Sequence, residues 1–386
     1  MSPPSSKTKA KFSQALSEAE HITRHNQDPF QVRIENFIGY TQVPVGLAGP
    51  LFIRTLDGAG QEICAPLATT EAALIASCCR GCKAANACGG VQYTTGDEGM
   101  SRGPSFELHT PSDAFKFVQA LPELEDPLAK VAESTSKHLC LKSLTPHVIG
   151  SFVHILFNYT CGDAAGHNMV TIATERACAW VLKTVAGEYN IKNFYIEGQM
   201  ASEKKASWGN VKTARGLEVT AWTSISDPVC RRVLGCSSEH LYEILQMGQE
   251  ACIRNGQHGN NIDVANVLAA AFIATGQDAA SITDASWSHL TPEYDRESER
   301  VTLSLYFPSL PVGVVGGGTR YATQQEALRI MRCDGAGKKR QLAGFIAAFA
   351  LALEVSTAAS VVNNTFAQSH ERLARRTAEN GARSRL

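Results

Sequence analysis

The sequence predicts an α+β protein in which a small α+β unit is inserted into a larger domain that is rich in helices. Its 386 residues are enough for roughly two or three domains. Strand-like and helix-like runs alternate between residues 104 and 194, which is typical of a compact mixed unit. The Ala-rich segments Asn261–Thr275 and Gln341–Val362 have the length and apolar character of central helices.

The residues before the small unit divide into two parts. Residues 1–33 are polar and predict an arm with one short amphipathic helix around Phe12–Ile22. Pro and Gly residues from Val43 to Leu51 indicate turns and argue against a helix there. Two threonines before Glu71 can cap a helix that continues into a Cys-rich segment. We assign residues 34–103 to the first part of the large domain.

The small unit and the segment after it show different patterns. Residues 104–194 contain β-like runs at 105–110, 147–161 and 193–198, and helix-like runs at Ser112–Leu121 and Asn168–Ala186. Another strand is expected at Leu217–Ser226. Residues 195–386 then form the second part of the large domain, with a catalytic loop and a C-terminal helix and tail.

Charge and hydropathy exclude several classes of protein. Lys and Arg number 36 against 37 Asp and Glu, which argues against a nucleic-acid-binding surface because that needs a clustered basic excess. The polar N-terminus has no apolar core of a signal peptide. The most apolar stretch, Leu342–Leu353, looks too short to cross a bilayer before Glu354 interrupts it, so we expect a buried helix. These features predict a cytoplasmic protein with no membrane segment.

The 12 cysteines favour a structural interpretation. Cys79 and Cys82 form a CxxC, but no second pair and no nearby His accompany it. Small apolar side chains in the core therefore explain them better than a metal site or redox chemistry, and we predict no metal.

Four proton-handling or charged residues each lie in a distinctive local sequence: Glu71 in ATTEAAL, Lys204 in SEKKAS, Asp278 in TGQDAAS and His370 in QSHERLAR. Together they supply a carboxylic acid, an ammonium group, a carboxylate and an imidazole, which are the groups needed to reduce a thioester. Each also has a structural interpretation. Lys204 and His370 suit a solvated surface, Asp278 suits a helix-terminal turn, and Glu71 suits the first turn of a helix.

These segments, with others in the same order, closely resemble the 3-hydroxy-3-methylglutaryl-CoA (HMG-CoA) reductase family in its eukaryotic-type catalytic form. The other matching segments are ENFIGYTQVPVGLAGPL (35–51), EGMSRGP (98–104), GDAAGHNM (162–169), NNIDVANVLAAAFIATGQDAA (260–280) and VGVVGGGT (312–319). The resemblance covers nearly everything after residue 30. It implies a large helical domain with an inserted ferredoxin-like cofactor domain, and a homo-oligomer whose active site lies at the subunit interface.

The resemblance also implies a chemistry, namely a two-step reduction of an acyl-CoA to an alcohol with two NADPH. Lys204 would stabilise the anionic oxygen that follows the first hydride transfer. His370 would protonate the departing thiolate, since an imidazole titrates near neutral pH. Glu71 would donate a proton to the aldehyde oxygen, and Asp278 would couple the titrations of Lys204 and Glu71.

The segment GDAAGHNM matches the family's nicotinamide-dinucleotide segment DAMGMNM, with His167 in place of a methionine. Small residues there would let the cofactor backbone approach, and helix N-terminal amides favour phosphate. Two further cations that match the family favour NADPH over NADH, although they can equally be ordinary surface charges. The predicted cofactor-binding residues are Lys137, Asp163, Ala165, Gly166, His167, Asn168 and Arg375.

Departures from the family pattern concentrate around the acyl group. Glu197 replaces a serine, Gln199 an asparagine, Glu203 an aspartate, Asp263 a histidine and Gln246 a lysine. These changes make the predicted acyl pocket less cationic, although Arg102 remains to bind a carboxylate. The predicted substrate-binding residues are Arg102, Glu197, Gln199, Lys205, Asp263 and Asn266.

Three functional hypotheses follow. The first is reduction of HMG-CoA to mevalonate. The second keeps the cofactor and fold but changes the acyl thioester, as the altered pocket suggests. The third is a non-catalytic homologue that binds cofactor, against which the retention of all four catalytic residue types argues.

Overall fold

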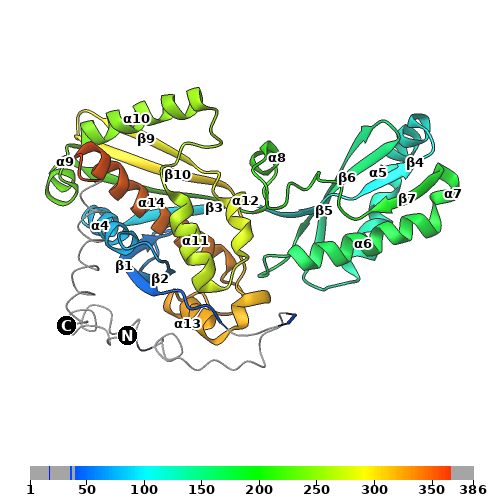
Figure 1. The fold of residues 1–386 in the computed structure, drawn as a ribbon, viewed down its shortest axis with the longest axis horizontal. Coiled ribbons are helices and arrows are strands. Elements are labelled where there is room, and N and C mark those ends of the chain that lie inside the picture. Colours follow the sequence, from blue (N-terminus) through cyan, green and yellow to red (C-terminus); the bar gives the residue numbers. More distant parts are fainter. Residues whose placement is uncertain (1–16, 18–34, 37–39, 367–386) are drawn as a thin grey trace, which may run out of the picture.

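A computed structural model describes residue 17, residues 35–36 and residues 40–366 (Figure 1). The predicted helix around Phe12–Ile22 lies outside the described residues, apart from Ser17. Two lobes are joined through a strand that takes part in the sheets of both, β3 (Val91–Arg102). Each lobe has its own hydrophobic core, and the core of the smaller lobe is built from residues between Met100 and Ile191.

The larger lobe contains a sheet in addition to the expected helices. The strands follow the order β2 (Gly60–Ala68), β1 (Val45–Arg54), β3, β8 (Gly216–Ser226), β10 (Arg300–Leu310) and β9 (His289–Asp295). The pairing of β1 with β3 is parallel and the other pairings are antiparallel. The Pro- and Gly-rich segment that predicted turns forms much of β1, with an irregular register between Ala48 and Leu51.

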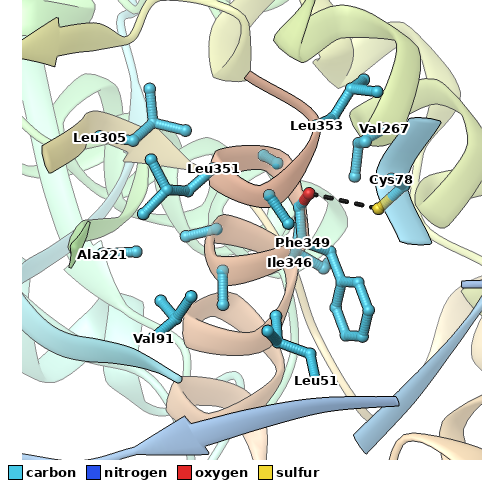
Figure 2. Close-up of a cluster of buried hydrophobic side chains, with 14 of the residues drawn as sticks. Leu51, Cys78, Val91, Ala221, Val267, Leu305, Ile346, Phe349, Leu351 and Leu353 are labelled. Atoms are coloured by element: carbon cyan, nitrogen blue, oxygen red, sulfur yellow. Dashed lines mark hydrogen bonds between the residues drawn. The ribbon is translucent and has the colours of Figure 1, made fainter. Parts of the chain in front are cut away.

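Helix α14 (Lys339–Val362) lies at the centre of this lobe (Figure 2). It packs against β3, β8 and β10 of the sheet and against α4 (Leu74–Asn86) and α11 (Val264–Thr275). Where α4 packs against α14, the Sγ of Cys78 donates to the backbone oxygen of Phe349 at 3.5 Å. The expectation of a buried helix is confirmed, since nearly every residue from Leu342 to Ser360 is shielded from solvent.

Glu354 ends the most apolar stretch but not the helix itself, which runs to Val362 as expected. The Glu354 carboxylate is fully buried and accepts hydrogen bonds from the amides of Ile262 and Asp263, so a charged residue type is tolerated inside the core. Among the described residues, α14 alone is long and apolar enough to cross a membrane by length and composition. However, 89% of its most apolar part is buried inside the protein.

The smaller lobe has a ferredoxin-like β-α-β-β-α-β order, which confirms the predicted fold class. Its elements are β4 (Ser105–Leu108), α5 (Pro111–Glu133), β5 (Cys140–Ile149), β6 (Phe152–Thr160), α6 (His167–Thr184) and β7 (Ile191–Tyr195). The antiparallel strands lie in the order β5–β6–β4–β7, with the end of β3 also paired to β6. Helix α5 continues past Leu121, where the prediction ended it, through two internal prolines.

The other helices are short or lie at the edges of the lobes: α7 (Ala186–Tyr189), α8 (Trp208–Lys212), α9 (Asp227–Val229), the π-helix η2 (Cys230–Leu234), α10 (Ser238–Asn255), the 3₁₀ helices η3 (Ala279–Ser281) and η4 (Gly317–Arg320), α12 (Ile282–Ala285) and α13 (Ala322–Ile330). All 12 cysteines lie within the described residues and none forms a disulfide. Burial raises the pKa of Cys82 well above its usual value, which keeps this thiol protonated and unreactive.

Candidate active site

Lys204 and Asp278 form an ion pair in which Nζ lies 2.7 Å from Oδ2. Lys204 lies in the segment between β7 and α8, whereas Asp278 follows the C-terminal Gly276 of α11 and caps η3 by accepting from the amide of Ala280. Burial opposes ionisation of Asp278, but the hydrogen bonds from Lys204 and Ala280 outweigh it and lower its pKa. About 41% of the Lys204 side chain is exposed, so its ammonium group remains accessible to a ligand.

The segment that carries Lys204 is conformationally strained. Gln199, Ser202 and Lys204 have φ angles of 68°, 54° and 54°, a left-handed region that non-glycine residues adopt at a cost. Such conformations persist only where surrounding contacts hold them. The geometry at Lys204 therefore depends on the residues that anchor this segment.

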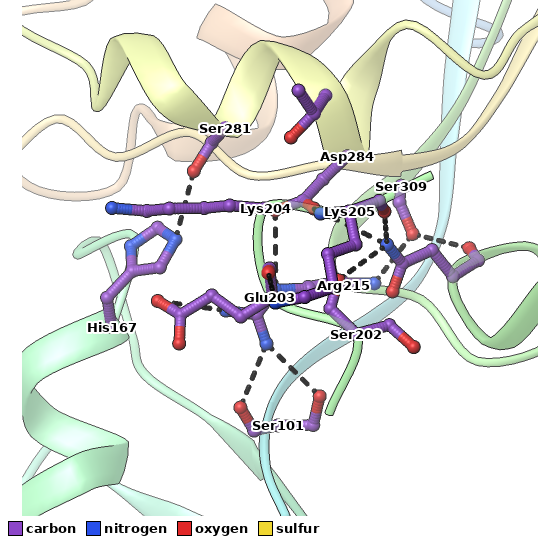
Figure 3. Close-up of polar contacts among 12 residues, drawn as sticks. Ser101, His167, Ser202, Glu203, Lys204, Lys205, Arg215, Ser281, Asp284 and Ser309 are labelled. Atoms are coloured by element: carbon purple, nitrogen blue, oxygen red, sulfur yellow. Dashed lines mark hydrogen bonds and ion pairs between the residues drawn. The ribbon is translucent and has the colours of Figure 1, made fainter. Parts of the chain in front are cut away.

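A buried ion-pair network provides that anchor (Figure 3). Arg215 is 1% exposed and Asp284 is fully buried, and Nε of the first lies 3.4 Å from Oδ2 of the second. Arg215 also donates to the backbone oxygen of Ser101 at 2.9 Å and lies 3.5 Å from Glu203. Burial raises the pKa of Asp284 to about 6, although the Arg215 charge acts in the opposite direction.

The same network holds the backbone on both sides of Lys204. Oδ1 of Asp284 accepts from the amide of Lys205 at 3.2 Å. The side-chain amide of Asn210 donates to the backbone oxygens of Ser202 and Lys205, at 3.2 and 3.0 Å. Sequence reasoning missed Asn210, Arg215 and Asp284. The one available signal was a charged Arg215 directly before an apolar strand.

His167 brings the predicted cofactor segment of the smaller lobe to the Lys204–Asp278 pair. Its Nε2 lies 3.2 Å from Oγ of Ser281, in the η3 turn that Asp278 caps. Burial, and after it the positive charge of Arg215, lowers the pKa of His167 to about 4. The imidazole is therefore neutral at pH 7 and can lie beside the Lys204 ammonium without charge repulsion (Figure 3).

Arg102, at the end of β3, is 8% exposed and is surrounded by internal partners. Its NH1 lies 2.9 Å from Glu197 and 2.6 Å from Glu203, and its NH2 donates to Oγ1 of Thr171 at 2.7 Å. The other oxygen of Glu197 accepts from the amide of Gln199 at 2.7 Å. The predicted substrate-binding residues Arg102, Glu197 and Gln199 thus lie together, next to the Lys204 segment.

The predicted cofactor segment leads into the N-terminus of α6. Gly166 precedes the helix with a φ of 104°, and no side chain caps the first-turn amides. Asp163 ties the segment to the larger lobe, because its Oδ2 accepts from Gly337 and its backbone oxygen from Val314, at 2.8 and 2.9 Å. Ala165 lies against Gly313, where an added Cβ would come within 2.4 Å of its nitrogen. Asn168 and Lys137 are exposed.

Glu71 lies between β2 and α4, which begins at Leu74, three residues later than expected. Ala68 at the end of β2 packs with Ala274 in the last turn of α11, so Glu71 lies at the same end of α11 as Asp278. Within residues 40–366, no hydrogen bond joins the Glu71 carboxylate to Lys204 or Asp278. The predicted residues His370 and Arg375 lie outside the described part of the chain.

Asp263 and Asn266 lie at the opposite end of α11. This helix of 12 residues is about 18 Å long, so one chain cannot bring Asp263 and the Lys204–Asp278 pair to the same small acyl group. The Asp263 carboxylate accepts from Oγ1 of Thr357 at 2.8 Å, within the larger lobe. Gln246 lies partly exposed on α10.

A second cationic region lines a cavity of about 510 Å³ between α4, η2 and the part of β1 at Gly49 and Pro50. Arg80, Lys83 and Arg232 supply the charge. Arg80 is held in place by Ser356, whose Oγ accepts from its Nε at 2.9 Å, and by Ser360. Sequence analysis did not single out these residues, although Arg80 and Lys83 are three apart and so share one face of a helix.

Comparisons with known proteins agree with this architecture. The family model described as hydroxymethylglutaryl-coenzyme A reductase matches residues 6–375. The 3-hydroxy-3-methylglutaryl-coenzyme A reductase of Methanocaldococcus jannaschii is 34% identical over 365 residues, covering 93% of this chain and 89% of that protein. The reductase of Aeropyrum pernix is 36% identical over 360 residues, covering 90% of this chain and 83% of its own length.

A solved structure has the same fold. It is the class II 3-hydroxy-3-methylglutaryl-CoA reductase of Streptococcus pneumoniae, bound to NADPH in open conformations. It matches with a TM-score of 0.72 at 19% identity, covering 93% of this chain and 98% of the other. By the extent of the family match and the identity to full-length relatives, this chain belongs to the hydroxymethylglutaryl-coenzyme A reductase family.

Proposed function

We propose that this protein is an oxidoreductase that reduces HMG-CoA to mevalonate with NADPH, in two successive reductions of the thioester carbon. The observation that carries the proposal is the accessible Lys204 ammonium group, held by Asp278 on a strained segment that a buried network supports. Membership of the family supports the same activity.

The residues present fit a bound dinucleotide. The first-turn amides of α6 have no side-chain cap and the first turn contains no acidic residue, so these amides can donate to a phosphate. Gly166 leaves this approach open, and Asp163, Ala165, His167 and Asn168 would line it. Lys137 and Arg375 would meet the 2′-phosphate of NADPH. When bound, NADPH supplies the hydride. In this proposal residues 104–194 form the cofactor-binding unit.

Lys204 stabilises the negative charge that develops on the substrate oxygen in both reductions. An ammonium group is a compact donor of several hydrogen bonds, and a fixed positive charge needs no reorganisation when the oxygen becomes anionic. Asp278 orients Lys204 through their 2.7 Å contact. The proton roles remain as predicted, with Glu71 as donor to the aldehyde oxygen and His370 as donor to the departing thiolate.

The cavity between α4 and η2 suits the phosphates of coenzyme A. Arg80, Lys83 and Arg232 supply positive charge there, and phosphates bind such clusters. Helix α4 links this cavity to the reaction centre, since Glu71 precedes its first turn and Lys83 lies in its last turn, about 20 Å away. An acyl-CoA lying along this helix would extend from the cations to the catalytic residues.

The length of α11 supports a homo-oligomer with a shared site. Asp263 lies about 18 Å and Asn266 about 14 Å from the Asp278 end of α11, so in this proposal they reach an acyl group near Lys204 from a second subunit. In each shared site, one subunit would contribute the Lys204–Asp278 end of α11 and the other would contribute the Asp263 end. The symmetry of a dimer would then produce two such sites.

Steady-state oxidation of NADPH with HMG-CoA as substrate tests the proposal. Lys204→Ala should lower kcat by at least about 100-fold, which is the usual cost of losing one oxyanion donor. Lys212→Ala, an exposed lysine at the end of α8, is the matched control and should keep native turnover. Turnover that survives Lys204→Ala would contradict the mechanism. Calorimetric binding of NADPH without turnover of any acyl-CoA would support the non-catalytic alternative instead.

A further inference from the structure

Arg102 is the less enclosed of the two guanidinium groups near Lys204, since 9% of its side chain is exposed against 1% for Arg215. Arg215 is 1% exposed and is engaged by Ser101, Glu203 and Asp284. Lys204 is committed to the substrate oxygen in the proposed function. The Lys205 ammonium instead turns outward and donates to the backbone oxygen of Glu203. Arg102, which keeps a small exposed area, is thus the carboxylate partner that this part of the described chain offers.

Two internal carboxylates already occupy Arg102, and they are held unequally. Glu203 is within 2.6 Å of Arg102 and is also within 3.5 Å of Arg215, so two guanidinium groups hold it. Glu197 has Arg102 as its one cationic partner among the described residues, and its other oxygen accepts from the Gln199 amide in the strained segment. Glu197 is therefore the carboxylate that an incoming anion displaces.

Arg102 also has a donor that no group of the described chain fills. Its Nε is buried and has no hydrogen-bond partner among the described residues. A buried donor without a partner is costly, and a carboxylate placed side-on to the guanidinium group would satisfy it. Glu197 approaches NH1, whereas Nε lies on the same edge as NH2, so a carboxylate that pairs with Nε would lie beside Glu197 and meet its negative charge.

We infer that Glu197 is an internal carboxylate that competes with the substrate for Arg102, and so sets the acyl selectivity of this enzyme. An acyl group with its own carboxylate has to displace Glu197, or bind beside it against like-charge repulsion. An uncharged acyl group meets neither cost. The native enzyme should therefore prefer carboxylated acyl-CoA substrates only weakly. A variant without the Glu197 charge should prefer them more strongly. This inference rests on the proposed function.

The test compares two substrates that differ in the terminal charge, HMG-CoA and 3-hydroxybutyryl-CoA. The quantity measured is the ratio of their kcat/KM values in the native enzyme, Glu197→Gln and Glu197→Ser. Removing the competing charge should raise the ratio about tenfold in favour of HMG-CoA, the usual size of one charge-assisted contact. Glu197→Asp keeps the charge and should keep the native ratio. Glu107→Gln, which removes an acidic side chain elsewhere in the smaller lobe, should also keep it.

A second readout does not need turnover. Calorimetric Kd values of HMG-CoA, measured without NADPH, should tighten about tenfold in Glu197→Gln and not in Glu107→Gln. Thermal denaturation of each variant checks that it is folded. If folded Glu197→Gln shows an unchanged or lowered kcat/KM ratio and an unchanged Kd for HMG-CoA, the inference is overturned. HMG-CoA turnover by the native enzyme would still support the proposed function in that case. Absence of turnover in the native enzyme overturns the function, and the Kd comparison then still decides the inference.

Discussion

The Oγ of Ser281 lies 3.2 Å from Nε2 of His167, and this contact joins the predicted cofactor segment of one lobe to the η3 turn of the other. His167 is the first residue of α6, and Ser281 ends the η3 turn that Asp278 caps. A change at the cofactor segment can therefore alter the position of Asp278, and through it that of Lys204.

Replacing His167 by methionine should lower kcat by roughly three- to tenfold, because the contact that positions the η3 turn is lost. Ser281→Ala should have a similar effect. Since both substitutions remove the same contact, the double variant should lose no more than the larger single loss. Steady-state kinetics of the three variants measures this coupling. Additive losses would show that the two residues act independently.

The neutral His167 also predicts a pH effect on stability. Burial holds its folded pKa at about 4, below its usual value, so the unfolded chain binds a proton between about pH 6.5 and 4 while the folded chain does not. Stability should fall as the pH drops through this window, by up to about 3 kcal/mol from this residue. Urea unfolding of the native protein and His167→Met, at pH 7 and 4.5, isolates the contribution. An equal loss in both proteins would contradict it.

The buried Arg215–Asp284 pair should be costly to break. Asp284→Ala leaves Arg215 buried without its closest countercharge and should destabilise the protein by about 3–5 kcal/mol. Any folded fraction should also lose activity, since the strained Lys204 segment loses its anchor. The exposed pair Arg231–Asp227 is the matched control, and Arg231→Ala should cost less than about 1 kcal/mol. Denaturant midpoints compare the two. Equal costs would mean that burial adds nothing to the contribution of the Arg215–Asp284 pair.

The buried carboxyl of Glu354 predicts a pH dependence of the opposite sign. Burial, and after it the nearby Asp263 carboxylate, raises its pKa well above the usual value. The stability from its protonated form is fully present below about pH 4.5 and is lost as the pH rises through the folded pKa. Glutamine does not titrate, so Glu354→Gln should gain stability relative to the native protein as the pH rises from 5 to 9. Unfolding curves that keep a constant separation over this range would contradict the prediction.

Gly166 should be intolerant of a side chain. Its φ of 104° is unfavourable for other residues, and an added Cβ would lie 2.4 Å from Sγ of Cys161. Gly166→Ala should therefore move the start of α6 and weaken NADPH binding by about tenfold or more. Gly187→Ala, in α7 where a Cβ meets nothing within 4 Å, should leave NADPH affinity unchanged. Fluorescence titration with NADPH compares them.

Local patterns predicted much of the molecule. Alternating strand- and helix-like runs indicated the smaller lobe, because a strand or helix imposes its own period on neighbouring residues. The apolar content of Gln341–Val362 predicted a buried helix, and α14 is buried. Predictions were less accurate where a local signal was overruled by packing. Two prolines inside α5 and the turn-like Pro and Gly residues of β1 both lie in regular structure.

The sequence by itself determined the family, the α+β class and the segments that contain Lys204 and Asp278. Each of these is encoded in short stretches of neighbouring residues. Folding alone decided that Asp284 and Arg215 anchor the Lys204 segment and that Glu197 occupies Arg102. These partners are tens of residues apart. An ion pair between distant residues depends on how strands and helices pack, and leaves no periodic trace in the chain that carries it.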